Sequence, residues 1–328
     1  MNLKNTKICI TGIGGFIGRR LAEILKSRGA IVSGVEVNPE SAEELRRSGF
    51  EVVNGNTSDR NLLENFLRGK DIVIHTAAIV REGGDFEEFR NVNVHATVLL
   101  AGIARELGLR AFVHLSSVMV YGFDYVEGID EDGELKGEGN PYCTTKIEGE
   151  KALQGLMNDR FGIIIIRPGD VYGSGSRPWV LRPLELMQLG LFSLPDGGTG
   201  RMNCTHVDNL CAGILLSLEK EAYGGVFNIT DGDTVTWKEY FDKLAVSGGF
   251  SPPLSLPAIL ARALVEVVGF GFRMVGKPSP VSGEGIDFIL RKHPVSIERA
   301  RKILGYEPVI SMQEGLRSTF EWVSRERN

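Results

Sequence analysis

The feature that most constrains this chain is a glycine-rich turn near its N-terminus. Apolar residues at 8–10 are followed by Gly12, Gly15 and Gly18, and then by apolar residues spaced as on one helix face. This order predicts a strand, a tight turn and a helix. Gly12 allows the tight turn, Gly15 lets the backbone approach a pyrophosphate, and Gly18 lets helix and strand pack closely. The stretch therefore predicts a dinucleotide site at the helix N-terminus.

An acidic residue, Glu36, completes this pattern. It ends a second apolar strand, 30–35, at the distance from the glycines where a carboxylate can accept hydrogen bonds from the adenosine ribose hydroxyls. The same carboxylate would repel a 2′-phosphate. The alternative is a solvated glutamate, with Arg19 and Arg20 near enough in sequence to serve a phosphate. We expect NAD as the cofactor, with NADP less favoured.

The composition is that of a soluble globular protein. The 328 residues are 42% hydrophobic, and the net charge of −5 gives no case for nucleic-acid binding. The four cysteines form no C-x-x-C pair, which favours a reduced cytoplasmic setting, and the histidine spacing predicts no metal site. Asn2 and Lys4 stand where a signal peptide would carry its apolar core, so we do not expect secretion. Arg262 and Glu266 make the segment 254–272 a poor membrane span.

Strand and helix patterns alternate through the first half of the chain. Strands are predicted at 50–53, 71–74, 111–115 and 163–166, and helices at 60–67, 86–107 and from 142 to about 160. Continuous apolar runs are expected of parallel strands covered on both faces. The sequence therefore predicts an α/β fold with a Rossmann-type, doubly wound parallel sheet. A helix predicted at 207–218 and a strand predicted at 226–229 complete this fold.

The pattern loosens after Pro168. Glycines and prolines between 169 and 200 indicate loops rather than regular β–α units, and the chain from 236 onward is predicted to be helical with breaks at 252–253 and 278–280. We therefore expect two parts. These are an NAD-binding Rossmann domain over 1–175, completed by about 203–230, and a smaller discontinuous substrate-binding lobe over 176–202 and 231–328.

Ser117, Tyr142 and Lys146 are the candidate catalytic residues. Ser117 follows the strand 111–115, at the carboxyl end where ligands of parallel sheets bind. Tyr142 and Lys146 lie four residues apart on one helix face and can serve one site. Because a phenol with a pKa near 10 transfers protons poorly at pH 7, its pKa must fall by about 2 to 3 units. We expect Lys146 and an oxidised nicotinamide to lower the pKa of Tyr142, and Ser117 to orient a substrate oxygen.

In this order, the motifs resemble those of the extended short-chain dehydrogenase/reductases, in the NAD-dependent epimerase/dehydratase group. The resemblance covers nearly the whole chain. It rests on 11–18, His75-Thr76-Ala77-Ala78, 93–97, Ser117 before Tyr121-Gly122, Tyr142 with Lys146, 167–173 and 206–209. It implies that Ser117, Tyr142 and Lys146 are catalytic, and that hydride moves between nicotinamide C4 and a substrate carbinol carbon.

The resemblance also implies a set of cofactor-binding residues. Asn56 stands where many relatives carry an aspartate near the adenine. Asn93 and His75 also have structural alternatives to cofactor binding. Asn93 can be an amide that starts a helix, and His75 can be an imidazole packed in the core. The expected cofactor-binding residues are Gly12, Gly14, Gly15, Phe16, Ile17, Glu36, Asn56, Thr57, Thr76, Ala77, Ala78, Asn93, Tyr142, Lys146, Pro168 and Val171.

Within this family, the residues leave two main functions open. The residues at 118–120 stand where dehydratases carry Asp-Glu, which disfavours dehydration. The segments 254–272 and 304–308 resemble the 3β-hydroxysteroid dehydrogenase-like branch, which handles apolar alcohols. The segment 195–198 and Arg201 stand where sugar-nucleotide enzymes hold their diphosphate.

We therefore expect an NAD-dependent oxidoreductase that acts on a secondary alcohol or ketone, 3β-hydroxysteroid-like or otherwise apolar. The alternative is a sugar-nucleotide epimerase similar to UDP-glucose 4-epimerase. A third hypothesis is a non-catalytic NAD-binding regulator, which the intact Ser117, Tyr142 and Lys146 disfavour.

The segment 254–272 carries an apolar stripe at helical spacing, while Arg262 and Glu266 share another face. The stripe comprises Leu256, Ile259, Leu260, Ala263, Leu264, Val267 and Val268. This helix can pack on the small lobe as ordinary core. It can also act as a lid that selects an apolar alcohol drawn from a membrane surface. We expect a homodimer that binds a small-molecule alcohol, ketone or sugar nucleotide, with peripheral membrane contact through 254–272.

Overall fold

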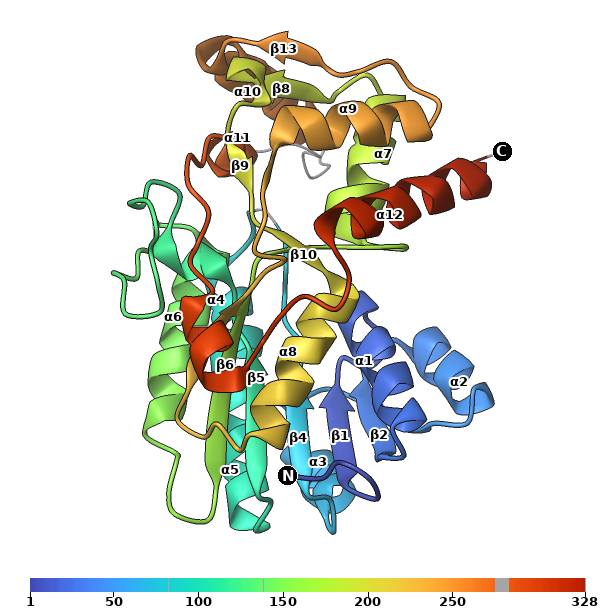
Figure 1. Cartoon of the computed structure of the whole chain (residues 1–328), viewed down its shortest axis with the longest axis vertical. Coiled ribbons are helices and arrows are strands. Elements are labelled where there is room, and N and C mark those ends of the chain that lie inside the picture. The colour runs from blue at the N-terminus through green and yellow to red at the C-terminus, as the bar shows by residue number, and fades with distance from the viewer. Residues whose placement is uncertain (82, 138, 275–282, 328) are drawn as a thin grey trace.

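A seven-stranded parallel sheet organises the structure, which is a computed structural model describing residues 1–81, 83–137, 139–274 and 283–327 (Figure 1). The strand order is β11-β6-β5-β4-β1-β2-β3, and each neighbouring pair is parallel. The strands are β1 (Lys7–Thr11), β2 (Ile31–Glu36), β3 (Glu51–Asn54), β4 (Ile72–His75), β5 (Ala111–Leu115), β6 (Gly162–Pro168) and β11 (Val226–Ile229). The predicted doubly wound α/β fold is confirmed.

Helices cover both faces of this sheet. On one face lie α1 (Phe16–Ser27) and α8 (Val207–Glu219), and on the other lie α3 (Arg60–Leu67), α5 (Ala96–Glu106) and α6 (Pro141–Gln154). Alternate strand residues enter the two cores: Ile8 and Ile10 pack with α1 and α8, whereas Cys9 packs with α3 and α5. Because both faces are buried, the strands are continuous apolar runs.

The helices differ from the predicted ones in three places. The predicted helix 86–107 consists of α4 (Phe86–Arg90), a π-helical turn η1 (Asn91–His95) and α5. The helix that begins at Pro141 ends at Gln154 instead of continuing to 160. The helix α2 (Pro39–Arg47) was not predicted because it is short and buries few side chains. Its start was marked by Asn38, whose side chain accepts a hydrogen bond from the Ser41 amide at 2.8 Å.

A second group of elements lies beyond the carboxyl ends of the strands (Figure 1). Short strand pairs, β7 with β10, β8 with β13 and β9 with β12, connect its segments. Its elements are β7 (Asp170–Tyr172), η3 (Arg177–Leu181), α7 (Arg182–Gln188), β8 (Ser193–Pro195), η4 (Asp196–Gly198), β9 (Arg201–Met202), β10 (Cys204–His206), β12 (Val235–Thr236), α9 (Trp237–Ser247), β13 (Leu254–Leu256), α10 (Ala258–Met274), α11 (Glu284–Ile289) and α12 (Met312–Arg327). The turn η5 (Ala300–Leu304) packs instead on α8 and β11 of the first part. The interval 169–200 thus contains a helix, α7, that the sequence prediction left out. The predicted break at 278–280 lies outside the described residues.

The end of the chain is shared between the two parts. Trp237, Phe241 and Phe288 belong to an aromatic core in the second group. In contrast, Ile297 and Tyr306 belong to the core between α8 and the sheet. The domain limits expected from the sequence stay a prediction, and part of the segment assigned to the substrate lobe packs on the sheet.

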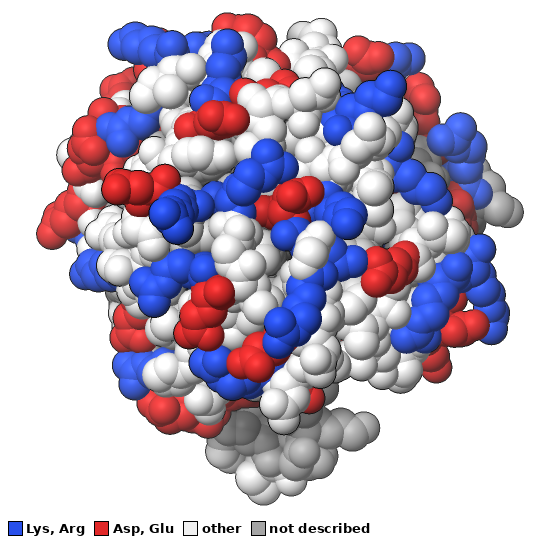
Figure 2. All heavy atoms as spheres, turned by 90° about the horizontal axis from the view of Figure 1, so that it is seen from below, with Lys and Arg blue, Asp and Glu red and all other residues white. Residues whose placement is uncertain are grey.

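The described surface agrees with the small net charge. On the face shown in Figure 2, lysine and arginine side chains alternate with aspartate and glutamate side chains, so this face presents no block of one sign. None of the helices in the described ranges has the length and apolarity of a bilayer-spanning segment.

A buried ion pair joins α6 to β6. Arg167 donates to Glu150 through Nη2–Oε2 at 2.6 Å and Nε–Oε1 at 3.0 Å, and the two side chains are 4% and 2% exposed. The remaining donor, Nη1, bonds to the Tyr121 hydroxyl at 2.8 Å and the Glu131 carbonyl at 3.1 Å. These bonds fix α6, which carries Tyr142 and Lys146, against the sheet.

We predict that Glu150→Ala lowers the free energy of unfolding by about 3 to 5 kcal/mol, because Arg167 would keep an uncompensated buried charge. Urea unfolding followed by circular dichroism measures this loss. Glu148→Ala is the matched control, since Glu148 lies on the same helix and pairs with a half-exposed Arg90; its cost should stay below about 1 kcal/mol. Equal losses would show that the buried pair contributes no more than a surface pair.

Candidate active site

The candidate site lies at the carboxyl ends of β1, β4, β5 and β6. In the sheet β1 lies between β4 and β2, so the chain winds outward in opposite directions from this point. Ligands of open parallel sheets bind at such a topological switch point. The glycine turn follows β1, the segment 76–78 follows β4, and Ser117 follows β5.

The glycine turn has the geometry that its sequence predicts. Gly12 has a φ of +69°, and a Cβ at this position would lie 3.0 Å from the backbone of Ala77. A Cβ on Gly18 would collide with the Gly12 carbonyl. No side chain caps the N-terminus of α1, which leaves the first helical turn open to an anion. This cradle fits the pyrophosphate of a dinucleotide.

Glu36 is buried, at 7% exposure, so the solvated alternative does not hold. Its Oε2 accepts a hydrogen bond from the Gly14 amide at 2.8 Å, and its Oε1 accepts one from the Asn38 amide at 2.9 Å. The carboxylate is thereby fixed beside the glycine turn. Its charge in this place opposes a 2′-phosphate, as expected for an NAD site.

Arg19 and Arg20 are paired with carboxylates. Arg19 donates to both carboxylate oxygens of Glu44, at 2.6 and 3.0 Å. Arg20 donates to both carboxylate oxygens of Asp208, at 2.5 and 3.0 Å. The alternative in which these arginines serve a phosphate of NADP loses support, because each guanidinium already has a bidentate partner.

The loop after β4 is tied to both the glycine turn and α6. The Thr76 hydroxyl donates to the Thr11 carbonyl at 2.8 Å. Asn93, buried in the π-helical turn, accepts from the Ile79 amide at 2.8 Å and donates to the Thr145 hydroxyl at 3.2 Å. Asn93 therefore holds the 76–79 backbone, with Ala77 and Ala78, close to the helix of Tyr142.

His75 is a packed imidazole. Its Nδ1 lies 2.6 Å from the Thr11 hydroxyl, and its Nε2 lies 2.9 Å from the Thr97 hydroxyl. Burial lowers the pKa of His75 to about 3, so the ring is neutral. It supports the strand end and has no free nitrogen for a ligand.

The other expected cofactor residues divide into two places. Asn56 and Thr57 follow β3; Asn56 is exposed, and its Oδ1 accepts from the Ser58 amide at 2.9 Å. Val171 packs on the same core as Phe16 and Ile17 at the start of α1, and Pro168 ends β6. These contacts with a cofactor stay predictions.

Ser117, Tyr142 and Lys146 come together in a buried cluster. The Nζ of Lys146 lies 5.9 Å from the centre of the Tyr142 ring and donates to the Leu115 carbonyl at 2.7 Å. The Ser117 hydroxyl lies close enough to the Tyr142 phenol to lower its pKa, and it accepts a hydrogen bond from the Met119 amide at 3.1 Å. The strand end and the first two turns of α6 thus supply the three side chains.

The electrostatics of this cluster differ from the expectation. Burial raises the pKa of Tyr142, and the Ser117 hydrogen bond lowers it by less. Burial also lowers the pKa of Lys146 to about 8, against the opposing effect of Glu150. The expectation that Lys146 brings Tyr142 near ionisation is not met in the chain alone, because both groups lose their hydration. An oxidised nicotinamide would bring additional positive charge.

Glu150 is the residue near this cluster that sequence reasoning missed. It follows Lys146 by one helical step of four residues, as Lys146 follows Tyr142. That i, i+4, i+8 spacing was a signal that all three side chains share one helix face. The partner Arg167 comes from β6, and no local pattern indicates that pairing.

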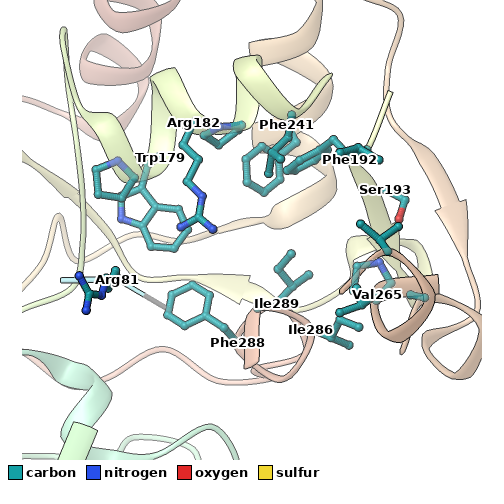
Figure 3. A pocket seen from close by; sticks show the side chains of 18 of the residues that line it. Arg81, Trp179, Arg182, Phe192, Ser193, Phe241, Val265, Ile286, Phe288 and Ile289 are labelled. Atoms are coloured by element: carbon teal, nitrogen blue, oxygen red, sulfur yellow. The ribbon is translucent and has the colours of Figure 1, made fainter. Parts of the chain in front are cut away.

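A cavity of about 360 Å³ opens beside Tyr142, between the sheet and the second group of elements (Figure 3). Its walls are mostly apolar and aromatic: Trp179 stacks on Phe288 with ring centres 5.0 Å apart, and Phe192 meets Phe241 at 4.7 Å. Arg201, which the sequence placed at a possible diphosphate site, is exposed and is not among the residues that line the cavity.

The helix α10 forms one wall of this cavity, and only two residues of the predicted stripe take part. Leu264 and Val268 of the stripe line the cavity together with Ala261 and Val265, whereas the rest of the stripe on α10 faces outward. The exposed apolar side chains of this segment are Leu254, Ile259, Leu260, Leu264, Val267, Phe270 and Met274. Leu256 belongs to β13, because the helix begins only at Ala258. The interpretation of the stripe as ordinary core is therefore wrong.

Comparison with known proteins gives a matching family and full-length relatives. A model described as the NAD dependent epimerase/dehydratase family matches residues 8–230. A 4-hydroxy-2-methyl-3-oxo-4-farnesyl-3,4-dihydroquinoline-1-oxide ketoreductase of Stigmatella aurantiaca is 26% identical over 94% of this chain and 93% of the relative. A sterol-4-alpha-carboxylate 3-dehydrogenase, decarboxylating, of Dictyostelium discoideum is 28% identical over 94% of this chain and 98% of the relative.

A solved structure shares the fold over nearly the whole chain. The UDP-glucuronic acid 4-epimerase of Bacillus cereus, in complex with UDP-glucuronic acid and NAD, superimposes with a TM-score of 0.78. The match is 24% identical and covers 98% of this chain and 100% of that chain. At this identity, the likeness shows the fold alone.

The pKa of Lys146 predicts a pH-dependent stability. The pKa is about 8 in the folded chain and 10.5 for the ordinary side chain. Between these values the unfolded chain holds a proton that the folded chain has released, so the free energy of unfolding rises with pH. Relative to Lys146→Met, the wild type should gain up to about 3 kcal/mol from pH 8 to 10.5. Urea unfolding across this range measures the gain, and parallel pH profiles would contradict it.

Proposed function

Because the chain belongs to the NAD-dependent epimerase/dehydratase family and is an NAD-using enzyme, we propose a hydride transfer as its reaction. The hydride moves between nicotinamide and a secondary alcohol or ketone with a large apolar body. The apolar cavity beside Tyr142 carries this proposal. The names of two relatives, a ketoreductase of a farnesyl-bearing ring and a sterol dehydrogenase, support it.

The roles of the buried cluster follow from its geometry. NAD, when bound, supplies the hydride acceptor for a carbinol carbon. Tyr142 takes the hydroxyl proton in oxidation and returns it in reduction, because its phenol is the titratable oxygen that lines the cavity. Ser117, whose hydroxyl lies beside that phenol, orients the substrate oxygen. Lys146 holds positive charge behind the ring, with its Nζ fixed by the Leu115 carbonyl.

The epimerase alternative has less support from the cavity. A sugar nucleotide carries a diphosphate and polar sugars, whereas the lining is mostly apolar. Arg201 lies outside the lining, and the Asp196 carboxylate accepts a hydrogen bond from the Ala258 amide at 2.7 Å. The non-catalytic alternative is disfavoured by the intact Ser117, Tyr142 and Lys146. The homodimer and the cytoplasmic location expected from the sequence stay predictions.

The helix α10 acts in this proposal as a lid between the cavity and the surroundings. Its inner face lines the cavity, and its outer face exposes Ile259, Leu260 and Val267. An apolar substrate could pass from a membrane surface along such a helix. The outer face then provides the peripheral membrane contact expected for 254–272.

The proposed function predicts that Tyr142→Phe lowers turnover by about 10² to 10⁴, the usual contribution of general acid–base catalysis, with NAD affinity changed only a few-fold. NADH absorbance with a panel of apolar secondary alcohols and a 3β-hydroxysteroid measures it. Chromatographic separation of the epimers follows a parallel panel of UDP-sugars, because epimerisation leaves no net NADH. Tyr223→Phe, at a partly exposed tyrosine outside the cavity lining, is the control. If the protein converts only UDP-sugars, the epimerase hypothesis replaces the proposed dehydrogenase function. Near-normal turnover of Tyr142→Phe would remove Tyr142 from the mechanism.

Two variants of α10 test its role as a lid and its membrane contact separately. Leu264 lines the cavity and Leu260 does not, although both are about half exposed. Leu264→Asp should raise the Michaelis constant for apolar alcohols about tenfold or more, because it places a charge at the cavity wall. Leu260→Asp should leave this constant unchanged and reduce co-sedimentation with lipid vesicles. If Leu264→Asp is neutral, α10 is not a lid; if Leu260→Asp binds vesicles normally, the outer face makes no membrane contact.

A further inference from the structure

Two stacked aromatic rings form part of the lining of the substrate cavity. Trp179 on η3 and Phe288 on α11 both line the cavity, and their ring centres lie 5.0 Å apart. Figure 3 shows both rings at the end of the cavity away from Val265. The helix α11 has only six residues and lies far from η3 in the sequence. The angle of the Phe288 ring therefore depends on contacts made behind it.

Arg291 makes such contacts from outside the cavity. Its side chain is fully buried, and it does not line the cavity. Its Cζ lies 3.7 Å from the centre of the Phe288 ring, and its Nε donates to the Phe288 carbonyl at 3.2 Å. Its own carbonyl accepts a hydrogen bond from the Arg201 amide at 2.6 Å. The guanidinium thus contacts both the ring and the main chain of Phe288.

Asp170 fixes the guanidinium from the direction of the sheet. The Nη2 of Arg291 donates to the Asp170 Oδ2 at 2.7 Å, and the aspartate side chain is 3% exposed. The same oxygen accepts a hydrogen bond from the Asn203 amide at 2.7 Å. Asp170 begins β7, two residues after Pro168 at the end of β6. The ion pair therefore ties Phe288 to the end of the sheet where the cofactor is expected.

Stability alone does not account for an arginine at this position. A buried ion pair loses much of its attraction to desolvation, and apolar residues of similar size often replace such a pair without loss of stability. In addition, the Nη1 of Arg291 is buried without a hydrogen-bond partner among the described residues. A guanidinium does provide direction, because its planar face and its rigid N–H donors favour one arrangement of its partners. These contacts therefore indicate a positioning role.

We propose that Arg291, anchored by Asp170, is a positioning residue that fixes the Phe288 ring against Trp179 and so sets the shape of the cavity for the apolar body of the substrate. This inference deepens the proposed function and rests on it. Arg291 acts through Phe288, and the hydride and proton transfers do not involve it. Because an apolar ligand is held by its fit to the walls, a displaced ring weakens binding rather than the chemical step.

The test replaces Arg291 with lysine in the NAD-supplied enzyme. Lysine keeps a positive charge beside Asp170, but it has neither the planar face that packs on Phe288 nor the Nε donor. With 2-dodecanol as substrate, Arg291→Lys should raise KM about tenfold or more, as one missing methylene group can in an apolar pocket. It should change kcat and the Kd for NAD by less than about threefold. An unchanged KM would make Arg291 only the partner of Asp170 and overturns the inference.

A second variant guards against a lysine that disturbs folding. Asp170→Asn combined with Arg291→Leu removes both charges together, so neither is left buried without a partner. Circular dichroism checks that this variant is folded. It should still raise KM for 2-dodecanol about tenfold, because leucine provides neither the planar face nor the donors. A KM equal to that of the wild type overturns the inference.

Two further variants separate positioning from a general structural effect. Phe288→Leu removes the ring itself, so the addition of Arg291→Lys should change KM by less than about twofold more. Losses that multiply would show that Arg291 does not act through Phe288, which overturns the inference. Arg177→Lys is the matched control, because Arg177 is 70% exposed and pairs with Glu185 at 3.2 Å outside the cavity lining. It should leave KM unchanged.

A binding measurement decides the inference without turnover. Prodan is an uncharged fluorescent ketone whose emission shifts in an apolar environment. Its Kd should rise about tenfold in Arg291→Lys and stay unchanged in Arg177→Lys. The absence of any alcohol oxidation would count against the proposed function, whereas an unchanged Kd for Prodan in Arg291→Lys overturns the inference about Arg291.

Discussion

The burial of one polar helix face against the sheet is the constraint on which the site depends. Tyr142, Lys146 and Glu150 lie on that face of α6, and each would be costly to desolvate alone. The Lys146 ammonium bonds to the Leu115 carbonyl, and Glu150 neutralises Arg167 on β6. These pairings set the position of the helix along β5 and β6. Because the phenol is carried by the same helix, its distance from Ser117 is fixed by bonds made deeper in the core.

The sequence predicted the sheet and the strand-end chemistry because both leave local patterns. Strands buried on both faces are continuous apolar runs, and the turn at Gly12 needs a residue that tolerates a positive φ. The pairing of Arg167 with Glu150 leaves no such pattern, since it depends on which strand meets α6. For α10, the sequence did not show which face is buried, and the reason is different. It is apolar on both sides, so periodicity could not tell the cavity face, with Ala261 and Val265, from the exposed face, with Leu260 and Val267.

Substrate choice is less accessible from sequence because the cavity is assembled from distant segments. The strand ends supply Tyr142 and the loop that carries Arg81, while η3, β8, α10 and α11 supply the opposite walls. The motif residues act on groups that many substrates share, a carbinol and a nicotinamide. The walls act on the rest of the molecule. The motifs therefore indicate a family, and the packed cavity supports the apolar substrate that the resemblance of 254–272 and 304–308 implied.

The dry environment of the cluster also makes proton transfer depend on the cofactor. Burial raises the pKa of Tyr142. The positive charge of an oxidised nicotinamide would lower that pKa, since a nearby cation favours the phenolate. The same apolar walls that keep water from the substrate therefore keep the phenol neutral until the cofactor is bound.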